Sequence, residues 1–159
     1  MRIRLGLARR REAPVIALMS RDLVEHGIPS SWNEDRVLNC LVDSSFVVVV
    51  ARHIRQVAGF AIAEFTYNKI HLDLLAVSQG YQRQGIGRQL IEWLESSAKT
   101  SGRKIMSLEV RASNAGAMGF YNRLGFYEES VKHDYYAGKD DAICLHRRLN
   151  SGLASIDSC

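Results

Sequence analysis

The chain has 159 residues, 47% of them hydrophobic and 24% charged, with a formal net charge of +4 at pH 7. This balance is typical of one globular domain and excludes a disordered or fibrous chain, and no apolar run reaches the ~18 residues of a membrane span. The basic residues are scattered apart from Arg9, Arg10 and Arg11, so the positive charge does not predict direct nucleic-acid binding.

The N-terminal part of the chain predicts one strand followed by two helices. Apolar residues alternate with other residues over residues 3–7, which favours a half-buried strand. Residues 12–26 have helical spacing, and Gly27 is expected to end that helix. Asn33 is expected to cap a second, shorter helix. The apolar face predicted for the first helix consists of Val15, Leu18, Met19, Leu23 and Val24.

The middle of the chain predicts three strands on short turns, which indicates an antiparallel meander. The β-branched run of residues 46–50 is typical of a strand covered on both faces. Residues 57–67 and 70–77 supply the next two strands. In the last of these, alternation places four apolar side chains on one shared face, namely Ile70, Leu72, Leu74 and Ala76.

The C-terminal part predicts two helices and three strands. The first helix has an apolar stripe from Ile86 to Ala98, and the second is closed by Gly125. In chain order, the strands and the second helix are expected at residues 105–110, 114–124, 126–132 and 141–149.

This order of elements predicts an α/β (α+β) fold. We expect a single domain over residues 1–150, built on a mixed, mostly antiparallel sheet of about seven strands with helices on both faces. Residues 151–159 are small and polar and are expected to form a disordered tail.

A glycine-containing loop lies between a predicted strand and a predicted helix, with the sequence Gln82-Arg83-Gln84-Gly85-Ile86-Gly87. Glycine lets a backbone approach a ligand closely, and the unpaired N–H groups of a helix start bind phosphate. A tight turn without a ligand explains the two glycines equally well. The loop lacks the Lys-Ser/Thr of a Walker motif and the third glycine of a dinucleotide fingerprint.

With its surroundings, this loop resembles the acetyl-CoA signature of the GNAT superfamily of acetyltransferases, Gln/Arg-x-x-Gly-x-Gly/Ala. The approach through Leu75-Ala76-Val77 matches as well. Residues 108–114 with 120–126, and Tyr135-Tyr136 followed by Asp141-Ala142, are similar to the RimI group, the ribosomal-protein alanine N-acetyltransferases. The resemblance spans residues 32–149.

The resemblance implies acetyl-CoA as co-substrate and no metal. The strand backbone would pair with the pantetheine amides, the loop amides would hold the pyrophosphate, and Asn114 would contact the pantetheine arm. Asn114 is explained equally well as a helix N-cap. The cofactor-binding residues that we expect are Leu75, Ala76, Val77, Gln82, Arg83, Gln84, Gly85, Ile86, Gly87, Arg88 and Asn114.

The resemblance also places Glu109 as general base and Tyr121 as general acid. An amine attacks only when neutral, so a carboxylate must accept a proton, and the departing thiolate is stabilised by a phenol that donates one. From the residues alone, a glutamate near a strand end also suits solvent, and a tyrosine between apolar neighbours also suits a core. Tyr135 and Tyr136 are implied to line the acceptor cleft.

The implied reaction is direct attack of an amine on acetyl-CoA. The resemblance favours the N-terminal α-amine of a protein, such as a ribosomal protein, as acceptor. A lysine or a small-molecule amine on the same fold is one alternative, and a non-catalytic acyl-CoA-binding module is another. We expect a monomer or weak dimer with no membrane partner.

The cysteines and histidines predict no metal centre. Cys40, Cys144 and Cys159 match neither a disulfide framework nor a zinc spacing, which favours a reducing cytoplasm. The isolated histidines have no metal-like spacing either.

Overall fold

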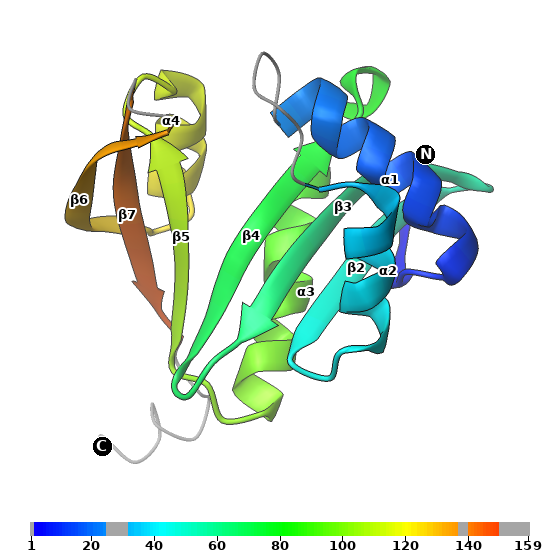
Figure 1. The fold of residues 1–159 in the computed structure, drawn as a ribbon, viewed down its shortest axis with the longest axis horizontal. Coiled ribbons are helices and arrows are strands. Elements are labelled where there is room, and N and C mark those ends of the chain that lie inside the picture. Colours follow the sequence, from blue (N-terminus) through cyan, green and yellow to red (C-terminus); the bar gives the residue numbers. More distant parts are fainter. Residues whose placement is uncertain (1, 25–31, 137–139, 150–159) are drawn as a thin grey trace.

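The chain folds around one seven-stranded sheet with helices on both faces (Figure 1). The computed structural model describes residues 2–24, 32–136 and 140–149. The helix end predicted at Gly27 and the tail predicted for residues 151–159 lie outside these ranges. Within them, no helix is long and apolar enough to cross a membrane.

The strands are β1 (Arg4–Leu7), β2 (Phe46–His53), β3 (Gln56–Phe65), β4 (Lys69–Val77), β5 (Ile105–Arg111), β6 (Tyr127–Tyr136) and β7 (Asp140–Arg148). The helices are α1 (Ala13–Met19), α2 (Glu34–Val42), α3 (Ile86–Thr100) and α4 (Ala115–Arg123). Three short turns of helix, η1 (Arg10–Glu12), η2 (Ser20–Val24) and η3 (Gln79–Tyr81), complete the described chain. The predicted fold class is confirmed.

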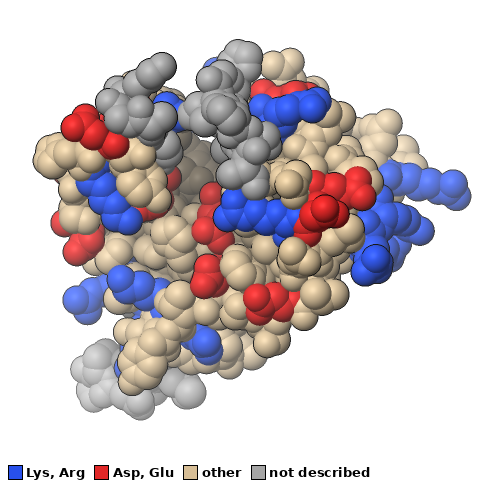
Figure 2. Space-filling model, in the orientation of Figure 1, with Lys and Arg blue, Asp and Glu red and all other residues tan. Residues whose placement is uncertain are grey.

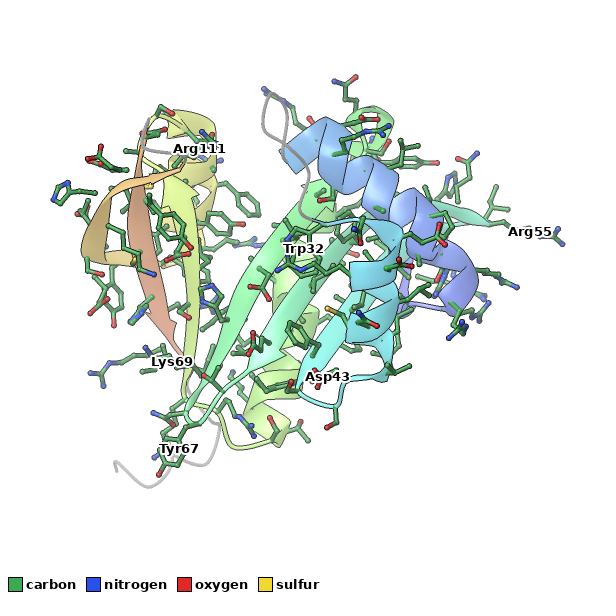
Figure 3. The ribbon with its side chains drawn as sticks, in the orientation of Figure 1. Trp32, Asp43, Arg55, Tyr67, Lys69 and Arg111 are labelled. Carbon is green, nitrogen blue, oxygen red and sulfur yellow. The ribbon has the colours of Figure 1, made fainter. Side chains whose placement is uncertain are left out.

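The sheet has the order β1-β2-β3-β4-β5-β7-β6, and every pair of neighbours is antiparallel except β4 and β5. This parallel pair is short, since it runs only from Lys69 opposite Ile105 to Leu72 opposite Leu108. Beyond that point the two strands diverge, as Figures 1 and 3 show from the Lys69 end to the Arg111 end.

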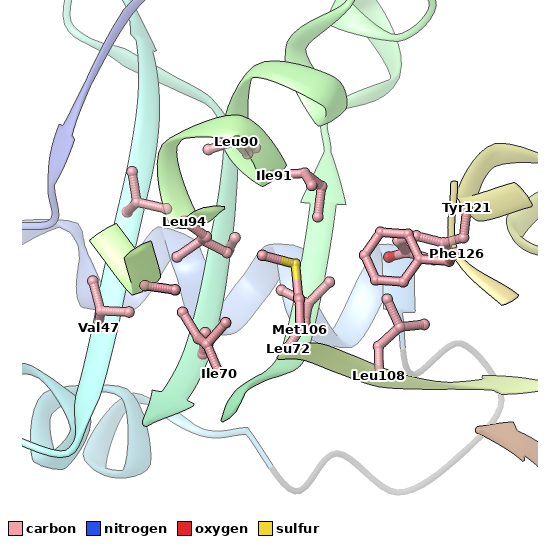
Figure 4. Packing of buried hydrophobic residues seen from close by; sticks show 14 of the residues in the cluster. Val47, Ile70, Leu72, Leu90, Ile91, Leu94, Met106, Leu108, Tyr121 and Phe126 are labelled. Atoms are coloured by element: carbon pink, nitrogen blue, oxygen red, sulfur yellow. The ribbon is translucent and has the colours of Figure 1, made fainter. Parts of the chain in front are cut away.

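Two apolar clusters cover the two faces of the sheet. One lies under α3 and α4 and includes Ile70, Leu72, Leu90 and Met106 (Figure 4). The other lies under α1 and α2. Strand β2 contributes alternate residues to both, since Val47, Val49 and Ala51 belong to the first cluster and Val48 and Val50 to the second, as a strand covered on both faces must.

The prediction of one shared apolar face on β4 is wrong because the strand contains a bulge. Ile62 of β3 lies opposite Leu74, while the next residue, Ala63, lies opposite Leu72. Asp73 is therefore an extra residue without a partner in the register. A bulge reverses the alternation of side chains that follows it. Leu72 accordingly packs in the α3 cluster and Leu74 in the opposite one.

The face predicted for the first helix is also wrong in part. Helix α1 ends at Met19 and continues as the π-helical turn η2. Ile16 is fully buried, whereas Val15 and Leu18 are 37% and 47% exposed. The buried stripe of α1 consists of Ala13, Ile16 and Met19. Leu7 of β1, predicted half-buried, is 61% exposed.

An ion pair that the sequence pattern did not predict anchors this N-terminal segment. Glu12 is buried, and its two carboxylate oxygens accept hydrogen bonds from Arg52 of β2 at 2.6 and 2.7 Å. The same guanidinium donates to the carbonyl of Leu7 at 2.9 Å. These bonds fix α1 and β1 to one end of the sheet.

The helix caps predicted at Asn33 and Gly125 are confirmed. Asn33 accepts a hydrogen bond from the N–H of Arg36 at 2.9 Å and starts α2. Gly125 follows α4 with a φ of 89°, a left-handed conformation that favours glycine.

The corrected face of α1 can be tested with a matched pair of variants. Ile16→Ala removes a fully buried side chain and is expected to lower the free energy of unfolding by ~2–5 kcal/mol. Leu18→Ala removes a half-exposed one and is expected to cost well under half as much. Urea unfolding measures both, and equal losses would contradict the observed face.

Candidate active site

A cleft of about 210 Å³ opens where β4 and β5 part. Its walls are residues 72–75 of β4, residues 108–111 of β5, and Asn114, Ala117 and Tyr121 at and within α4. The cleft reaches both faces of the sheet, because Tyr121 packs in the α3 cluster while its neighbour in the cleft, Leu74, packs in the opposite cluster.

Glu109 lies in this cleft with its side chain only 16% exposed. One carboxylate oxygen, Oε2, forms an ion pair with the ammonium of Lys132 at 2.5 Å. The same oxygen lies 3.8 Å from the thiol of Cys144, which is buried. Lys132 belongs to β6, so the glutamate is held by a strand two places away in the sheet.

Tyr135 of β6 contacts Glu109, so the structure brings two of the predicted site residues together. The negative charge of Glu109, then burial and a hydrogen bond to Glu109, raise the pKa of the Tyr135 phenol. The ammonium of Lys132 lies 5.1 Å from the centre of the Tyr135 ring. Tyr136 follows in β6 and pairs with Asp140 of β7 in the sheet.

Tyr121 lies on the other face of the sheet from Glu109. It is buried, and its ring makes edge contacts with those of Phe120 and Phe126. Burial raises the pKa of its phenol. The hydroxyl therefore keeps its proton at neutral pH, as a group that donates a proton must.

Both predicted interpretations of Asn114 are compatible with its position. Its side-chain oxygen accepts a hydrogen bond from the N–H of Ala117 at 3.0 Å, which makes it the N-cap of α4. It also lines the cleft.

The glycine-containing loop leads from the end of β4 to the start of α3. Gln82 donates a side-chain hydrogen bond to the carbonyl of Val77 at 2.9 Å, which ties the loop to the strand. Gly85, the N-cap of α3, has a φ of 81°. The N–H of Gln89 forms the first helical hydrogen bond of α3, to the carbonyl of Gly85 at 3.0 Å. The amides just before it have no partner within the helix.

Gly87 has a packing role that sequence reasoning missed. A Cβ built at this position would lie 3.1 Å from the Phe120 ring. The residue therefore lets α3 and α4 approach closely, in addition to any contact with a ligand.

The backbone of β4 beyond Leu72 has an open edge toward β5. Leu75, Ala76 and Val77 pair with β3 on one side, but the pairing with β5 ends at Leu72. Apart from the Val77 carbonyl, which accepts the Gln82 hydrogen bond, backbone groups on that edge are available to an extended ligand, as they would be to an added strand.

Asp73 is a cleft residue that sequence reasoning did not single out. Its Oδ2 atom is buried and has no hydrogen-bond partner among the described residues. Burial, and then the charges of Glu64 and Glu109, raise its pKa to about 6 against the opposing effect of Arg36. An aspartate inside the apolar run of residues 70–77 was the available signal.

His71 lies next to this group but forms no metal site. Its Nδ1 lies 2.8 Å from the hydroxyl of Ser107, and burial lowers its pKa. Across the described ranges, no three His, Cys, Asp or Glu side chains lie close enough together to hold a metal ion.

Asp and Glu side chains gather in the middle of the face that Figure 2 shows, whereas Lys and Arg side chains gather at its right-hand edge. Asp73 interacts electrostatically with Arg36 and Cys40 of α2, which places its carboxyl on the α2 side of the sheet. The carboxylates of Asp73 and Glu109 favour a cation in the cleft, against the opposing charges of Arg36 and Lys132.

Residues 15–126 match the acetyltransferase (GNAT) family, and the chain belongs to this family. It is 41% identical over 93 residues to the ribosomal protein bS18 alanine N-acetyltransferase of Escherichia coli strain K12. That match covers 57% of this chain and 63% of the relative, less than two thirds of its length. An N-alpha-acetyltransferase of Sulfurisphaera tokodaii is 37% identical over 78 residues, which cover 48% of this chain and 47% of the relative.

The solved structures agree on the fold. The crystal structure of the E. coli ribosomal-protein-S18-alanine N-acetyltransferase superposes with a TM-score of 0.82 at 28% identity, over 95% of this chain and 96% of that one. An N-acetyltransferase from Thermoplasma acidophilum in complex with coenzyme A has a TM-score of 0.80 at 20% identity, over 93% and 99% of the two chains. The predicted resemblance to the GNAT superfamily and its RimI group is confirmed.

The buried carboxyl of Asp73 generates a stability prediction. Its pKa of about 6 in the folded chain exceeds its ordinary value of 3.8, so the folded state binds this proton more tightly than the unfolded state does. Ionisation at neutral pH therefore destabilises the fold, and the penalty is relieved as the pH falls through 6. We expect Asp73→Asn to have a higher Tm than the wild type at pH 7.5, with the difference shrinking by pH 5.

Thermal unfolding at the two pH values measures this effect. Asp43→Asn is a matched control of opposite sign, because hydrogen bonds from Ser45 lower the pKa of that exposed carboxyl. A Tm of Asp73→Asn below that of the wild type at pH 7.5 would contradict the assignment of Asp73 as an unsatisfied buried carboxyl.

Proposed function

We propose that this protein is an N-acetyltransferase that moves the acetyl group of acetyl-CoA to the N-terminal α-amine of a protein by direct attack. One observation carries the proposal. The parted strands β4 and β5 form a cleft with an open backbone edge, and this cleft brings a carboxylate and a protonated phenol together from opposite faces of the sheet.

The donor occupies the α3 and α4 side of the cleft. The open edge from Leu75 to Val77 pairs with the pantetheine amides, and Asn114 contacts the same arm. The backbone amides from Gln82 to Arg88, in the loop and the first turn of α3, hold the pyrophosphate. The Thermoplasma relative, which has the same fold, was solved with coenzyme A.

The acceptor enters from the acidic side. An α-ammonium is a cation, and the carboxylates of this face attract it toward Glu109 (Figure 2). Tyr135, in contact with Glu109, lines this entrance. A ribosomal protein is the acceptor class we favour, because the E. coli relative acts on bS18.

The chemistry then uses one group from each face. Glu109 accepts a proton from the nitrogen, directly or through one water. The amine forms a bond to the acetyl carbon, and a backbone N–H near Val77 stabilises the oxyanion of the tetrahedral intermediate. Tyr121, whose pKa is raised, donates its proton to the departing thiolate.

The remaining predictions on domain and location belong to the same proposal. The catalytic domain comprises residues 1–150, and the enzyme works in the cytoplasm as a monomer or weak dimer. Neither a membrane nor a nucleic acid is a partner in this scheme.

The two catalytic roles predict distinct losses. Glu109→Gln and Tyr121→Phe are each expected to lower kcat by ~10²-fold or more, the usual scale for a positioned base or acid. Acetyl-CoA affinity, measured by calorimetry, should change little because neither side chain holds the cofactor. Lys132→Met is an informative control, since it removes only the partner of Glu109. Near-normal rates in both variants would refute the roles.

The choice of amine follows from proton affinity. A free α-amino group has a pKa of ~7.7–8.0 and a lysine ~10.4, so lysine adds ~3 kcal/mol of deprotonation work. We expect a peptide with a small, free N-terminal residue to be acetylated at least ~10²-fold faster, in kcat/KM at neutral pH, than its N-blocked lysine counterpart. Comparable rates would favour the lysine or small-amine alternative, and no turnover of any amine would favour the non-catalytic module.

A further inference from the structure

An acceptor that arrives as an ammonium must lose two protons before it becomes an amide. The first leaves before the attack, because the nitrogen needs its lone pair. The second leaves after the C–N bond has formed. These two protons differ in acidity, since the nitrogen is a far stronger acid once it is bonded to the tetrahedral carbon, so a weaker base suffices for the second.

The cleft contains two carboxylates in contrasting states. Glu109 is paired with the Lys132 ammonium at 2.5 Å, and the Cys144 thiol lies beside the same oxygen. Asp73 has a buried oxygen, Oδ2, that accepts no hydrogen bond from any described residue. Glu109 is thus already neutralised by a cation, whereas Asp73 still lacks a donor. A buried, unpaired carboxylate gains most from a proton or a cation placed beside it.

The groups around Asp73 reinforce this difference. Glu64 of β3 and Glu109 of β5 add negative charge, and only Arg36 of α2 opposes them. Cys40 of α2 also faces Asp73, but burial raises the pKa of its thiol to about 11 and keeps it neutral. Within the described part of the chain, these are the charged and titratable groups whose electrostatic effects involve the Asp73 carboxyl.

The β4 bulge explains how an acidic side chain reaches this position. Leu72 and Leu74 pack on opposite faces of the sheet, and Asp73 is the extra residue between them. Without the bulge, regular alternation would give Leu74 the same face as Leu72. The bulge thus places a carboxylate on the cleft wall, directly before the backbone edge that starts at Leu75.

We propose that Asp73 takes the first proton, from the incoming ammonium, and that Glu109 takes the second, after the C–N bond has formed. This inference rests on the proposed function and extends it. Two carboxylates divide work that the family resemblance implied for Glu109 alone.

The steps balance in atoms and charge. Asp73 removes one proton from R–NH₃⁺, and the resulting R–NH₂ forms the C–N bond with the acetyl carbon. The intermediate collapses, the C–S bond breaks, and Tyr121 gives its proton to the thiolate. Glu109 takes the surplus proton of the nitrogen and returns it, through water, to the Tyr121 phenolate. Asp73 releases its proton to solvent, so the products are the amide, free coenzyme A and one H⁺.

The test is the pH dependence of kcat/KM for the full chain with acetyl-CoA and an N-terminal peptide. The wild type should lose activity only below about pH 6, where Asp73 is protonated. The Asp73→Asn variant cannot deprotonate the ammonium and reacts only with an amine that is already neutral. The inflection of its kcat/KM profile should therefore move up to the α-amino pKa of ~7.7–8.0. The expected loss is roughly 15- to 30-fold at pH 6.5 and under ~3-fold at pH 9.

Two further variants separate this role from a structural one. Glu64→Gln removes a charge that raises the pKa of Asp73, so the acidic inflection should move to lower pH. Glu109→Gln should lower the rate at every pH, because its proton comes from the intermediate and not from the free amine.

The outcomes distinguish this inference from the proposed function. A loss in Asp73→Asn by one constant factor at all pH values, or no loss at pH 6.5, would overturn the role of Asp73. The activity of the wild type with the N-terminal and the lysine peptides shows which amine is the acceptor. If only the lysine peptide reacts, the N-terminal assignment fails. The role of Asp73 is then tested with the lysine peptide, from the ratio of kcat/KM of Asp73→Asn to that of the wild type across the pH range. Absence of turnover with every amine overturns both proposals.

Discussion

The parallel pairing of β4 and β5 is the constraint on which the rest of the site depends. It lasts for four residue pairs, from Lys69 to Leu72, and ends directly before Asp73, the extra residue of β4 in its pairing with β3. A sheet that stayed paired would be closed by its own hydrogen bonds and by a continuous apolar layer on each face. Where the strands part, backbone groups become available for hydrogen bonds, and a cleft connects the two faces of the sheet. Helix α4 and strand β6 then supply side chains to one opening from opposite sides.

Electrostatics gives the two sides of this opening different chemistry. On the α3 side, unpaired amides at a helix start favour an anion, and Tyr121 keeps its proton because it is buried. On the α1 side, carboxylates favour a cation, and burial gives Asp73 a raised pKa. In the proposed reaction, a negatively charged donor and a positively charged acceptor would approach from separate faces and meet at the gap, so they would not compete for one entrance.

Much of the fold could be predicted from the sequence because it depends on local periodicity. The alternation of the strands, the apolar stripe of α3 and the caps at Asn33 and Gly125 are short-range signals. The failures have long-range causes. The face of Leu74 was wrong because a bulge is defined by the register of the partner strand. The pairing of Glu109 with Lys132, a residue of β6, depends on strand order, which no local pattern contains. Asp73 could not be predicted as a site residue for the same reason, since the lack of a hydrogen-bond partner for its Oδ2 among the described residues arises only in the folded cleft.

The contact of Gly87 with Phe120 has a consequence for how sequences of this kind can vary. Gly87 belongs to the loop that faces the donor, and Phe120 immediately precedes Tyr121 in α4. A Cβ at position 87 would lie 3.1 Å from this ring, so Phe120 would have to shift by a few tenths of an ångström to admit a side chain there. A substitution at position 87 is therefore expected to displace Phe120, which directly precedes Tyr121. In the proposed reaction, donor recognition and acid catalysis would be linked through this single steric contact.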